Sequence, residues 1–170
     1  MIQKNILSGT LGIAAILITV NAMAADEKGI QGQWYSEDNV SKIHIYEHNG
    51  LYSGKIIWLE DPLYEKGDKE AGKIKRDREN PEKKLRKTPI IGLKILKNFK
   101  FDKKDKEWTG GTIYDPDKGK LYKCVIKFEK DSKVEGGTKL YVRGYVGIPA
   151  LGRTTYWTRV PEKDLEKLDE

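Results

Sequence analysis

The chain has 170 residues, and its 32 Lys and Arg side chains exceed its 26 Asp and Glu side chains, which gives a net charge of +6. Acidic and basic residues interleave along the sequence, so this excess does not predict nucleic-acid binding. One cysteine cannot form an intrachain disulfide or a cysteine zinc site, and two histidines leave little for a histidine metal centre. We therefore expect one globular domain with no cofactor.

The first 24 residues predict a signal peptide. Lys4 precedes an apolar run at residues 6–20, and the small-residue triplet Ala22-Met23-Ala24 follows it. The run is shorter than the roughly 20 apolar residues that a membrane-spanning helix needs. We expect cleavage after Ala24 and export to the periplasm or beyond, as in a Gram-negative bacterium. The mature form, residues 25–170, is expected to be a monomer that does not span the membrane.

Beyond residue 25, apolar residues recur with the two-residue period of β-strands, beginning with a short strand at 33–35. Asn49-Gly50 favours the positive φ angles of a type I′ turn, which pairs His48 with Leu51. This register separates a core face from an outer face. The expected core face holds Ile43, Ile45, Tyr52, Ile56 and Trp58, and the outer face mainly Lys42, His44, Tyr46, Ser53 and Lys55.

Further strands are predicted at 92–97, 108–114, 121–129, 140–146 and 154–160. The second and third of these form a hairpin, because Pro116 and Gly119 suit successive positions of the turn between them. The total is about eight strands without a convincing long helix. The fold class is therefore all-β, an antiparallel up-and-down barrel over residues 25–160, with a sandwich as the alternative. Residues 161–170 form a charged C-terminal tail.

One segment interrupts the strand pattern. Residues 60–89 contain ten basic and eight acidic residues without sustained alternation. Segments of this length are usually lids, binding loops or disordered regions. We expect a long charged loop or lid held across an open barrel end by its apolar residues, and a solvated insertion is the alternative. These apolar residues are Leu63, Tyr64, Ile74 and Leu85.

The two ends of the predicted barrel carry a recognisable pair of motifs. Gly32-Gln33-Trp34 opens the first strand and Arg159 closes the last. This resembles the G-x-W motif and the late arginine of lipocalin-like, calycin-type barrels. In that family the indole plugs the closed end and the guanidinium stacks over it, so the resemblance implies structural roles for Trp34 and Arg159.

Longer motifs follow one another along the mature chain: Gly54-Lys55-Ile56-Ile57-Trp58-Leu59, Asn80-Pro81, Leu85-Arg86, Pro89-Ile90-Ile91-Gly92-Leu93, Gly110-Gly111-Thr112-Ile113-Tyr114-Asp115-Pro116, Val142-Arg143-Gly144-Tyr145-Val146-Gly147, and Leu151-Gly152-Arg153-Thr154 with Trp157. In this order they resemble a bacterial exported family, the domain-of-unknown-function family 2147 (DUF2147). The resemblance implies a lipocalin-like barrel and leaves the reaction open. One departure is Arg86-Lys87-Thr88-Pro89, where the family more often has a second arginine just before the proline, which weakens the idea that two arginines grip an anion there.

Patterns for metal binding and catalysis are weak. His44 and His48 would lie about 13 Å apart on a strand that rises 3.3 Å per residue, so they cannot share an ion. Cys124 falls in an alternating apolar strand and is interpreted as a small core residue. Asp115 lies in a turn, and Gly110-Gly111 precedes Thr-Ile-Tyr on a strand, where paired glycines favour a bulge or a tight bend of the barrel. We name no catalytic and no metal-binding residue.

Arginine and aromatic residues form the remaining signal. Guanidinium groups bind carboxylate or phosphate in a fork, and aromatic walls supply apolar contact, so an apolar or amphipathic, lipid-like anion is a reasonable ligand class. The alternative is a structural role in cross-strand pairs. The predicted ligand-binding residues are Asn80, Arg86, Tyr114, Arg143, Tyr145, Arg153 and Trp157.

Three functions stay open on the sequence. The first is an exported barrel that binds a small apolar or amphipathic molecule through its open end. Because the apolar residues available for the interior are large, its cavity is expected to be small. The second is a cell-envelope interaction module whose basic, aromatic surface holds a polyanionic or protein partner. The third, less favoured, is an enzyme acting on an envelope component, for which no nucleophile or metal set is recognised.

Overall fold

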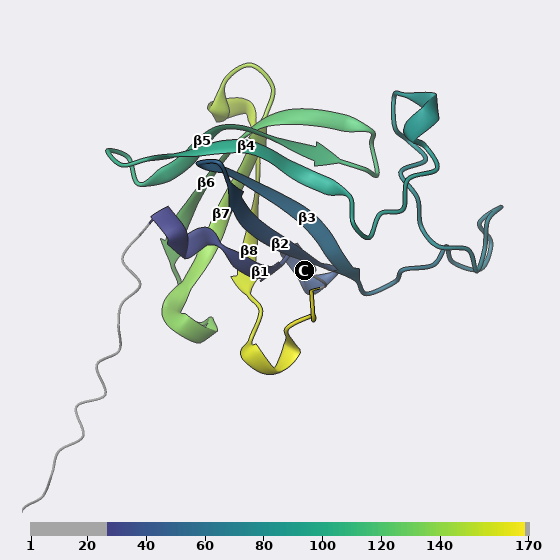
Figure 1. Ribbon diagram of the computed structural model, residues 1–170, viewed down its shortest axis with the longest axis horizontal. Helices are drawn as coiled ribbons and strands as arrows, with labels where there is room; N and C mark the ends of the chain where they lie inside the picture. Colours follow the sequence, from purple (N-terminus) through teal and green to yellow (C-terminus); the bar gives the residue numbers. More distant parts are fainter. Residues whose placement is uncertain (1–26, 169–170) are drawn as a thin grey trace, which may run out of the picture.

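The computed structural model describes residues 27–168, which form a closed barrel of eight antiparallel strands. The strands follow chain order around the barrel, and β8 closes it by pairing with β1 (Figure 1). This confirms the all-β antiparallel barrel; the signal-peptide prediction lies outside the described residues. The strands are β1 (Gly32–Tyr35), β2 (Ser41–His48), β3 (Leu51–Leu59), β4 (Lys94–Asp102), β5 (Glu107–Asp115), β6 (Lys120–Lys130), β7 (Thr138–Tyr145) and β8 (Arg153–Arg159).

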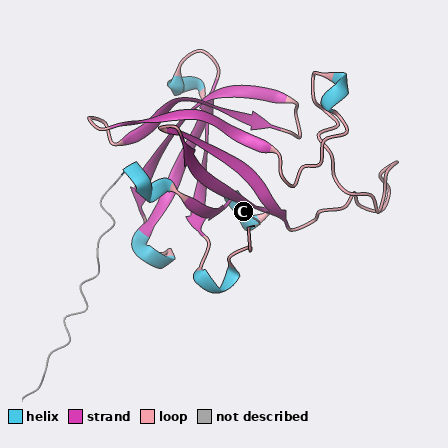
Figure 2. Cartoon of the chain, viewed as in Figure 1, coloured by secondary structure: helices cyan, strands magenta, loops and turns pink. Residues whose placement is uncertain are grey.

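Helical structure in the described part of the chain is confined to short 3-10 turns, which Figure 2 shows at the ends of strands and in loops. None of these turns is long and apolar enough to cross a membrane. They are η1 (Glu27–Ile30), η2 (Glu37–Asn39), η3 (Lys83–Leu85), η4 (Glu135–Gly137), η5 (Pro149–Leu151) and η6 (Glu162–Asp164).

The β2–β3 hairpin confirms the predicted register. Asn49 and Gly50 have φ angles of 53° and 75°, the left-handed values that a type I′ turn requires. His48 pairs with Leu51 across the turn. As the alternation predicts, the buried side chains of this hairpin include those of Ile43, Ile45, Tyr52 and Ile56.

Trp58 lies on the opposite face from the one predicted. Ile43 pairs with Ile56, whereas Lys42 pairs with Trp58, so β3 carries one extra residue at this point. Such a bulge reverses the alternation beyond it, and the prediction that Trp58 faces the core was therefore wrong. On the outer face the Lys42 ammonium lies 5.0 Å from the centroid of the Trp58 ring, and Lys42 is only 6% exposed.

The C-terminal segment covers this outer face. Lys42 Nζ donates to the main-chain carbonyl of Asp164 (2.7 Å) and pairs with the carboxylate of Glu166 (2.6 Å). The side-chain amide of Gln33 exchanges two hydrogen bonds with the main chain of Glu166, at 2.7 and 2.8 Å. The described part of the charged tail is therefore fixed against β1 and β2.

Trp34 and Arg159 close one end of the barrel. The guanidinium carbon of Arg159 lies 3.9 Å from the centroid of the Trp34 ring, and its nitrogens donate to main-chain carbonyls in segment 29–31. Gly32 has a φ of 115°, and a Cβ at this position would lie 2.7 Å from Arg159 Nη1, so the site requires glycine. The stacking that the G-x-W resemblance implies is present.

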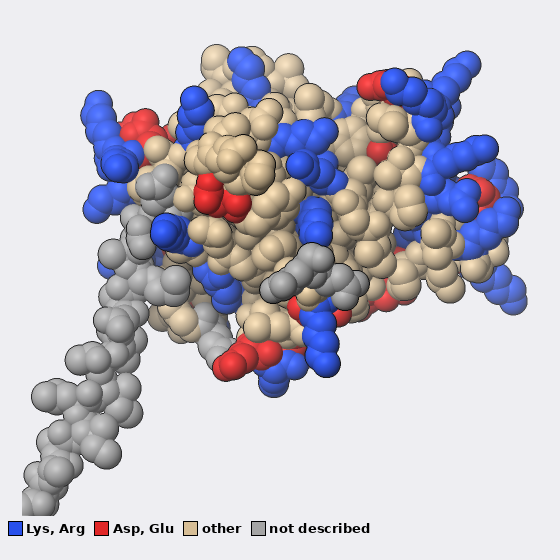
Figure 3. Space-filling model, viewed as in Figure 1, with Lys and Arg blue, Asp and Glu red and all other residues tan. Residues whose placement is uncertain are grey.

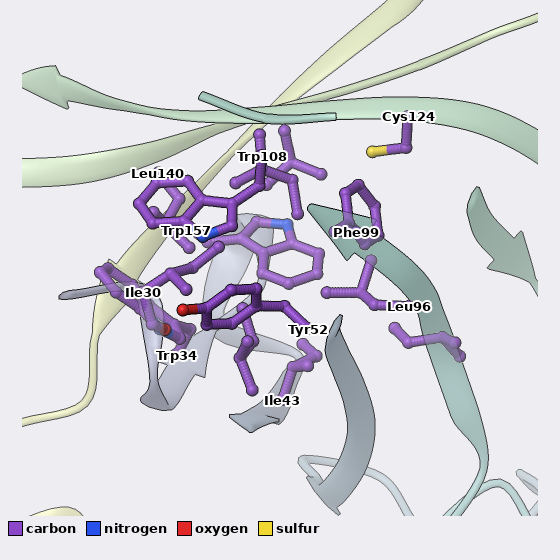
Figure 4. Close-up of a cluster of buried hydrophobic side chains, with 14 of the residues drawn as sticks. Ile30, Trp34, Ile43, Tyr52, Leu96, Phe99, Trp108, Cys124, Leu140 and Trp157 are labelled. Atoms are coloured by element: carbon purple, nitrogen blue, oxygen red, sulfur yellow. The ribbon is translucent and has the colours of Figure 1, made fainter. Parts of the chain in front are cut away.

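Aromatic side chains fill the barrel beside this closed end. The ring centroid of Trp108 lies 4.8 Å from that of Phe101 and 5.3 Å from that of Phe128. Figure 4 shows Trp34 and Tyr52 gathered around the same cluster, and both side chains are buried. Close packing of this kind leaves no room for a ligand at this end.

A bulge in β5 accommodates this packing. Trp108 pairs with Ile126 and Gly111 pairs with Cys124, so two residues of β5 stand opposite one residue of β6. This register shift confirms the bulge predicted from the paired glycines. A Cβ on Gly111 would overlap the ring of Phe99, so the close packing there requires glycine. Cys124 is buried in the core, as predicted, and burial raises the pKa of its thiol to about 12.

Candidate functional site

The end of the barrel opposite Trp34 contains a cavity of about 740 Å³. It lies among the β1–β2, β3–β4, β5–β6 and β7–β8 connections. Ligand pockets typically measure about 300–1,000 Å³, so the volume suits one small molecule. The cavity is larger than the bulky apolar residues suggested, because those side chains concentrate at the closed end.

Hydrocarbon side chains form the deep wall of the cavity. Trp157 lines the cavity and also belongs to the buried core, with 4% of its surface exposed. Its Nε1 donates a hydrogen bond to Thr155 Oγ1 at 3.2 Å. The apolar wall residues are Ile56 on β3, Ile95 on β4, Ile113 on β5, Trp157 on β8 and Ile90 from the β3–β4 connection.

Charged side chains surround the mouth with an excess of acids. Arg153 pairs with Glu37 at 3.2 Å, and Lys118 pairs with Asp115 at 2.8 Å. Lys75 makes no ion pair within the described residues. The carboxylates that line the cavity are Glu37, Asp38, Glu60, Asp61, Asp115 and Asp117, and the cations are Lys75, Lys118 and Arg153.

The β3–β4 connection, residues 60–93, extends to the side of the barrel (Figure 1). Two isolated bridges, Leu63 with Ile74 and Arg76 with Pro89, fold it back on itself. Lys and Arg side chains crowd the surface that it forms in Figure 3. Its inner edge reaches the cavity, because both Lys75 and Ile90 line the wall.

Asp77 fastens this connection to the barrel. Its side chain is fully buried; Tyr114 of β5 donates from its hydroxyl to Oδ1 at 2.7 Å, and Asn80 donates from Nδ2 to Oδ2 at 2.6 Å. Burial and the neighbouring carboxylate raise the pKa of the Tyr114 phenol. The β5–β6 turn packs as tightly against the connection, since a Cβ on Gly119 would overlap the Glu79 carbonyl oxygen. The 60–93 connection is therefore held in a fixed position and forms part of the cavity wall.

Four of the predicted ligand-binding residues line the cavity: Tyr114, Tyr145, Arg153 and Trp157. They do so in different ways. Trp157 forms the apolar floor, Arg153 lies on the exposed rim in its ion pair with Glu37, and the Tyr114 hydroxyl is engaged by Asp77.

The other three predicted residues lie outside the cavity. Asn80 is buried against Asp77, and Arg86 donates from Nε to the Asn80 carbonyl at 2.7 Å, so both contribute to the fastening of the connection. Arg143 lies on the outer face of β7, where it donates to Thr154 Oγ1 (2.7 Å) and to the carbonyl of Pro149 (2.6 Å). The structure does not bring the predicted arginines together.

The sequence reasoning missed Lys75, Ile90, Ile95 and Ile113 as cavity residues. Strand alternation marked apolar residues as core, but it does not tell a packed core from a cavity wall. Lys75 carried no signal at all, because it is one of ten cations in the 60–89 segment.

Two titratable side chains that could serve catalysis, those of His44 and Asp77, lie away from the cavity or are hydrogen-bonded to neighbouring side chains. In the described residues no group of three or more His, Cys, Asp or Glu could hold a metal ion. Burial, together with the charge of Lys55, lowers the pKa of His44, which lies on β2 away from the cavity residues. Both carboxylate oxygens of Asp77 accept hydrogen bonds from neighbouring side chains.

Lysine side chains occupy the outer face of β3 to β6. Lys55 pairs with Lys94 across β3 and β4, and Lys97 and Lys123 flank Thr112 in the same register. None of these lysines forms an ion pair within the described part of the chain. This face is therefore a basic surface separate from the cavity.

The closed end, the open cavity and the strand order define a lipocalin-like barrel. The Helicobacter pylori protein HP1028, whose solved structure is described as belonging to the lipocalin family, is similar with a TM-score of 0.63 and 22% identity, over 82% of this chain and 92% of that one. The family model described as an uncharacterized protein conserved in bacteria (DUF2147) matches residues 32–159, and this chain belongs to that family. No curated protein matches the sequence.

Proposed function

We propose that this protein is an exported, monomeric barrel that binds one small apolar or amphipathic molecule in the cavity at its open end. The observation that carries the proposal is the 740 Å³ cavity with its wall of isoleucine and tryptophan. Burying apolar ligand surface against such a wall contributes roughly 25 cal/mol per Å² before the costs of association are subtracted. Export is supported by the charged start, apolar run and small-residue triplet of residues 1–24.

The proposed binding residues follow from the cavity. Ile56, Ile95 and Ile113 hold the apolar part of the ligand, and Trp157 closes the floor beneath it. Arg153 with Glu37 lies on the rim. The rigid fastening of the 60–93 connection keeps the cavity preformed, which lowers the entropic cost of binding.

A fluorescent probe tests this proposal. N-phenyl-1-naphthylamine is apolar, uncharged at neutral pH and brighter in an apolar site, so wild-type protein is expected to bind it saturably with 1:1 stoichiometry. Ile113→Trp fills the cavity and is expected to abolish the signal. Thr112→Trp, which places the same side chain on the outer face of the same strand, is expected to leave it unchanged. Equal binding by the two variants would refute the proposal.

A second candidate function rests on the outer basic surface of β3 to β6. Unpaired lysines on one face attract polyanions through long-range electrostatics, so this surface is suited to a polyanionic envelope partner. Lys97→Glu with Lys123→Glu is expected to weaken retention on immobilised heparin, whereas Ile113→Trp is expected to have no effect. Retention that is unchanged by the double charge reversal would exclude this candidate.

A further inference from the structure

A second hollow lies beside the barrel mouth, between the 60–93 connection and the β5–β6 turn. Its volume is about 590 Å³, and unlike the barrel cavity it is lined mainly by polar and charged residues. Lys75, Ile90, Pro116 and Asp117 line both hollows. The polar hollow is therefore a direct neighbour of the apolar cavity.

Hydrogen bonds, a cation–π contact and an ion pair hold the residues of the polar hollow in place. Tyr64 is buried, and its hydroxyl donates to the Arg76 carbonyl (3.1 Å) and accepts from the Arg76 N–H (3.0 Å). Arg78 stacks 4.5 Å from the Tyr64 ring centroid and pairs with Asp68 at 2.7 Å. These contacts fix the main chain that carries the remaining cations.

Two partly buried cations of this hollow have no side-chain partner within the described residues. Lys75 and Arg76 are partly buried, yet neither side chain makes an ion pair or hydrogen bond within the described residues. Their main chain is held in place, since Ile90 donates from its N–H to the Lys75 carbonyl at 3.0 Å. A partly desolvated cation without a partner is costly, and a bound anion removes that cost.

The charges around the cavity mouth favour an acidic group on the side of the polar hollow. Four carboxylates, from Glu37, Asp38, Glu60 and Asp61, lie on the β1–β2 and β3 side of the cavity, and Arg153 offsets only that of Glu37. The polar hollow holds carboxylates too, but Arg78 pairs with those of Asp68 and Glu79 at 2.7 and 3.9 Å. The charges left without an ion pair are those of Lys66, Lys75 and Arg76 against those of Glu65 and Asp117, a small excess of cations that favours an anionic head group on this side.

We infer that the polar hollow is a subsite for an acidic head group, a carboxylate or phosphate held by Lys75 and Arg76, on a ligand whose apolar chain occupies the barrel cavity. This inference rests on the proposed function and adds the ligand class. The planar guanidinium of Arg76 supplies forked hydrogen bonds, and the ammonium of Lys75 supplies a point charge at the junction of the two hollows.

Displacement of bound N-phenyl-1-naphthylamine by four twelve-carbon compounds tests the subsite. Dodecanoate and dodecyl phosphate, which separate carboxylate from phosphate, are expected to displace the probe at concentrations about tenfold lower than dodecanol. Dodecylamine is expected to be the weakest. In Lys75→Gln with Arg76→Gln the advantage of the two anions over dodecanol, with all three compounds measured in that same variant, is expected to disappear.

The control is Lys83→Gln with Lys87→Gln, which removes two exposed cations of the same connection that line neither hollow. It is expected to keep the anion advantage. Three results would overturn the subsite while leaving the cavity proposal intact. The anion advantage could survive in the Lys75 and Arg76 variant, it could be lost equally in the control, or dodecylamine could displace the probe as well as the anions do. Failure of wild-type protein to bind the probe would overturn both.

Discussion

The two ends of the barrel use the same strands for opposite purposes. At the closed end, Trp34, Trp108 and Phe128 pack ring against ring, and Arg159 seals them. At the open end, isoleucines with smaller side chains face a cavity of about 740 Å³, and charged residues surround it. Under the proposed function, the closed end contributes mainly to stability and the open end to binding, so we expect substitutions at the closed end to change mainly the free energy of unfolding and those at the open end mainly ligand affinity.

The largest effect is expected at the closed end. Trp34→Ala removes the buried indole and the partner of Arg159, and large-to-small changes of this kind cost about 3–5 kcal/mol of unfolding free energy. Urea denaturation followed by circular dichroism measures the loss. Thr112→Trp at the outer surface serves as the reference, and a loss below about 1 kcal/mol for Trp34→Ala would contradict the assignment of stability to this end.

A smaller, local effect is expected at the fastening of the open end. Asp77→Ala leaves the Tyr114 hydroxyl and the Asn80 amide without their acceptor, which costs about 1–3 kcal/mol. The 60–93 connection, rich in Lys and Arg, then becomes more susceptible to trypsin. Asp61→Ala, an exposed carboxylate of the same connection, is the control. Equal cleavage rates in the two variants would show that Asp77 does not fasten the connection.

The pH dependence of the free energy of unfolding tests the burial of Cys124 in the core between the two ends. Burial raises the pKa of the folded thiol from the ordinary 9.0 to about 12, so the unfolded chain loses this proton first as pH rises. The contribution of the thiol to stability is therefore complete below pH 9 and declines between pH 9 and 12, by about 1 kcal/mol at pH 10. The difference in unfolding free energy between wild type and Cys124→Ala, measured at pH 7 and pH 10, checks it; a difference independent of pH would contradict the burial.

The smallest effect is expected on the outer face. Glu166→Gln replaces the carboxylate that pairs with Lys42 but keeps the main-chain bonds to Gln33. Because Glu166 is itself partly exposed, the expected loss is about 0.5 kcal/mol. Urea denaturation measures it, and a loss as large as that of Trp34→Ala would mean that the C-terminal segment is as important as the closed end.

The difference between the ends also explains what could be predicted from the sequence. Asn49-Gly50 determines its turn through local backbone preference, so the sequence predicts this hairpin with its register. Trp34 with Arg159 resembles a known motif, so the sequence also predicts the stacking at the closed end. Trp58 was misplaced because a bulge reverses alternation without a marking residue in the sequence.

The open end depends on contacts between residues far apart in the sequence. Asp77 is 37 residues from Tyr114, and nothing distinguishes it in sequence from the other acids of its segment. Lys75 joins two hollows through the fold alone. Arg143 was assigned to the ligand set by its residue type, but its position on β7 turns it outward. The residue type indicates which ligand chemistry is possible, but the fold determines which side chains face the cavity.

The central claim, that the open end binds and the closed end does not, is tested most directly by methyl NMR of isoleucine-labelled protein during a titration with dodecanoate. We predict saturable shifts of the methyl groups of Ile56, Ile90, Ile95 and Ile113, which line the cavity, and unchanged signals for Ile45 and Ile126 near the closed end. Shifts confined to surface methyl groups such as Ile74 and Ile148, or no saturable shifts at all, would contradict the account.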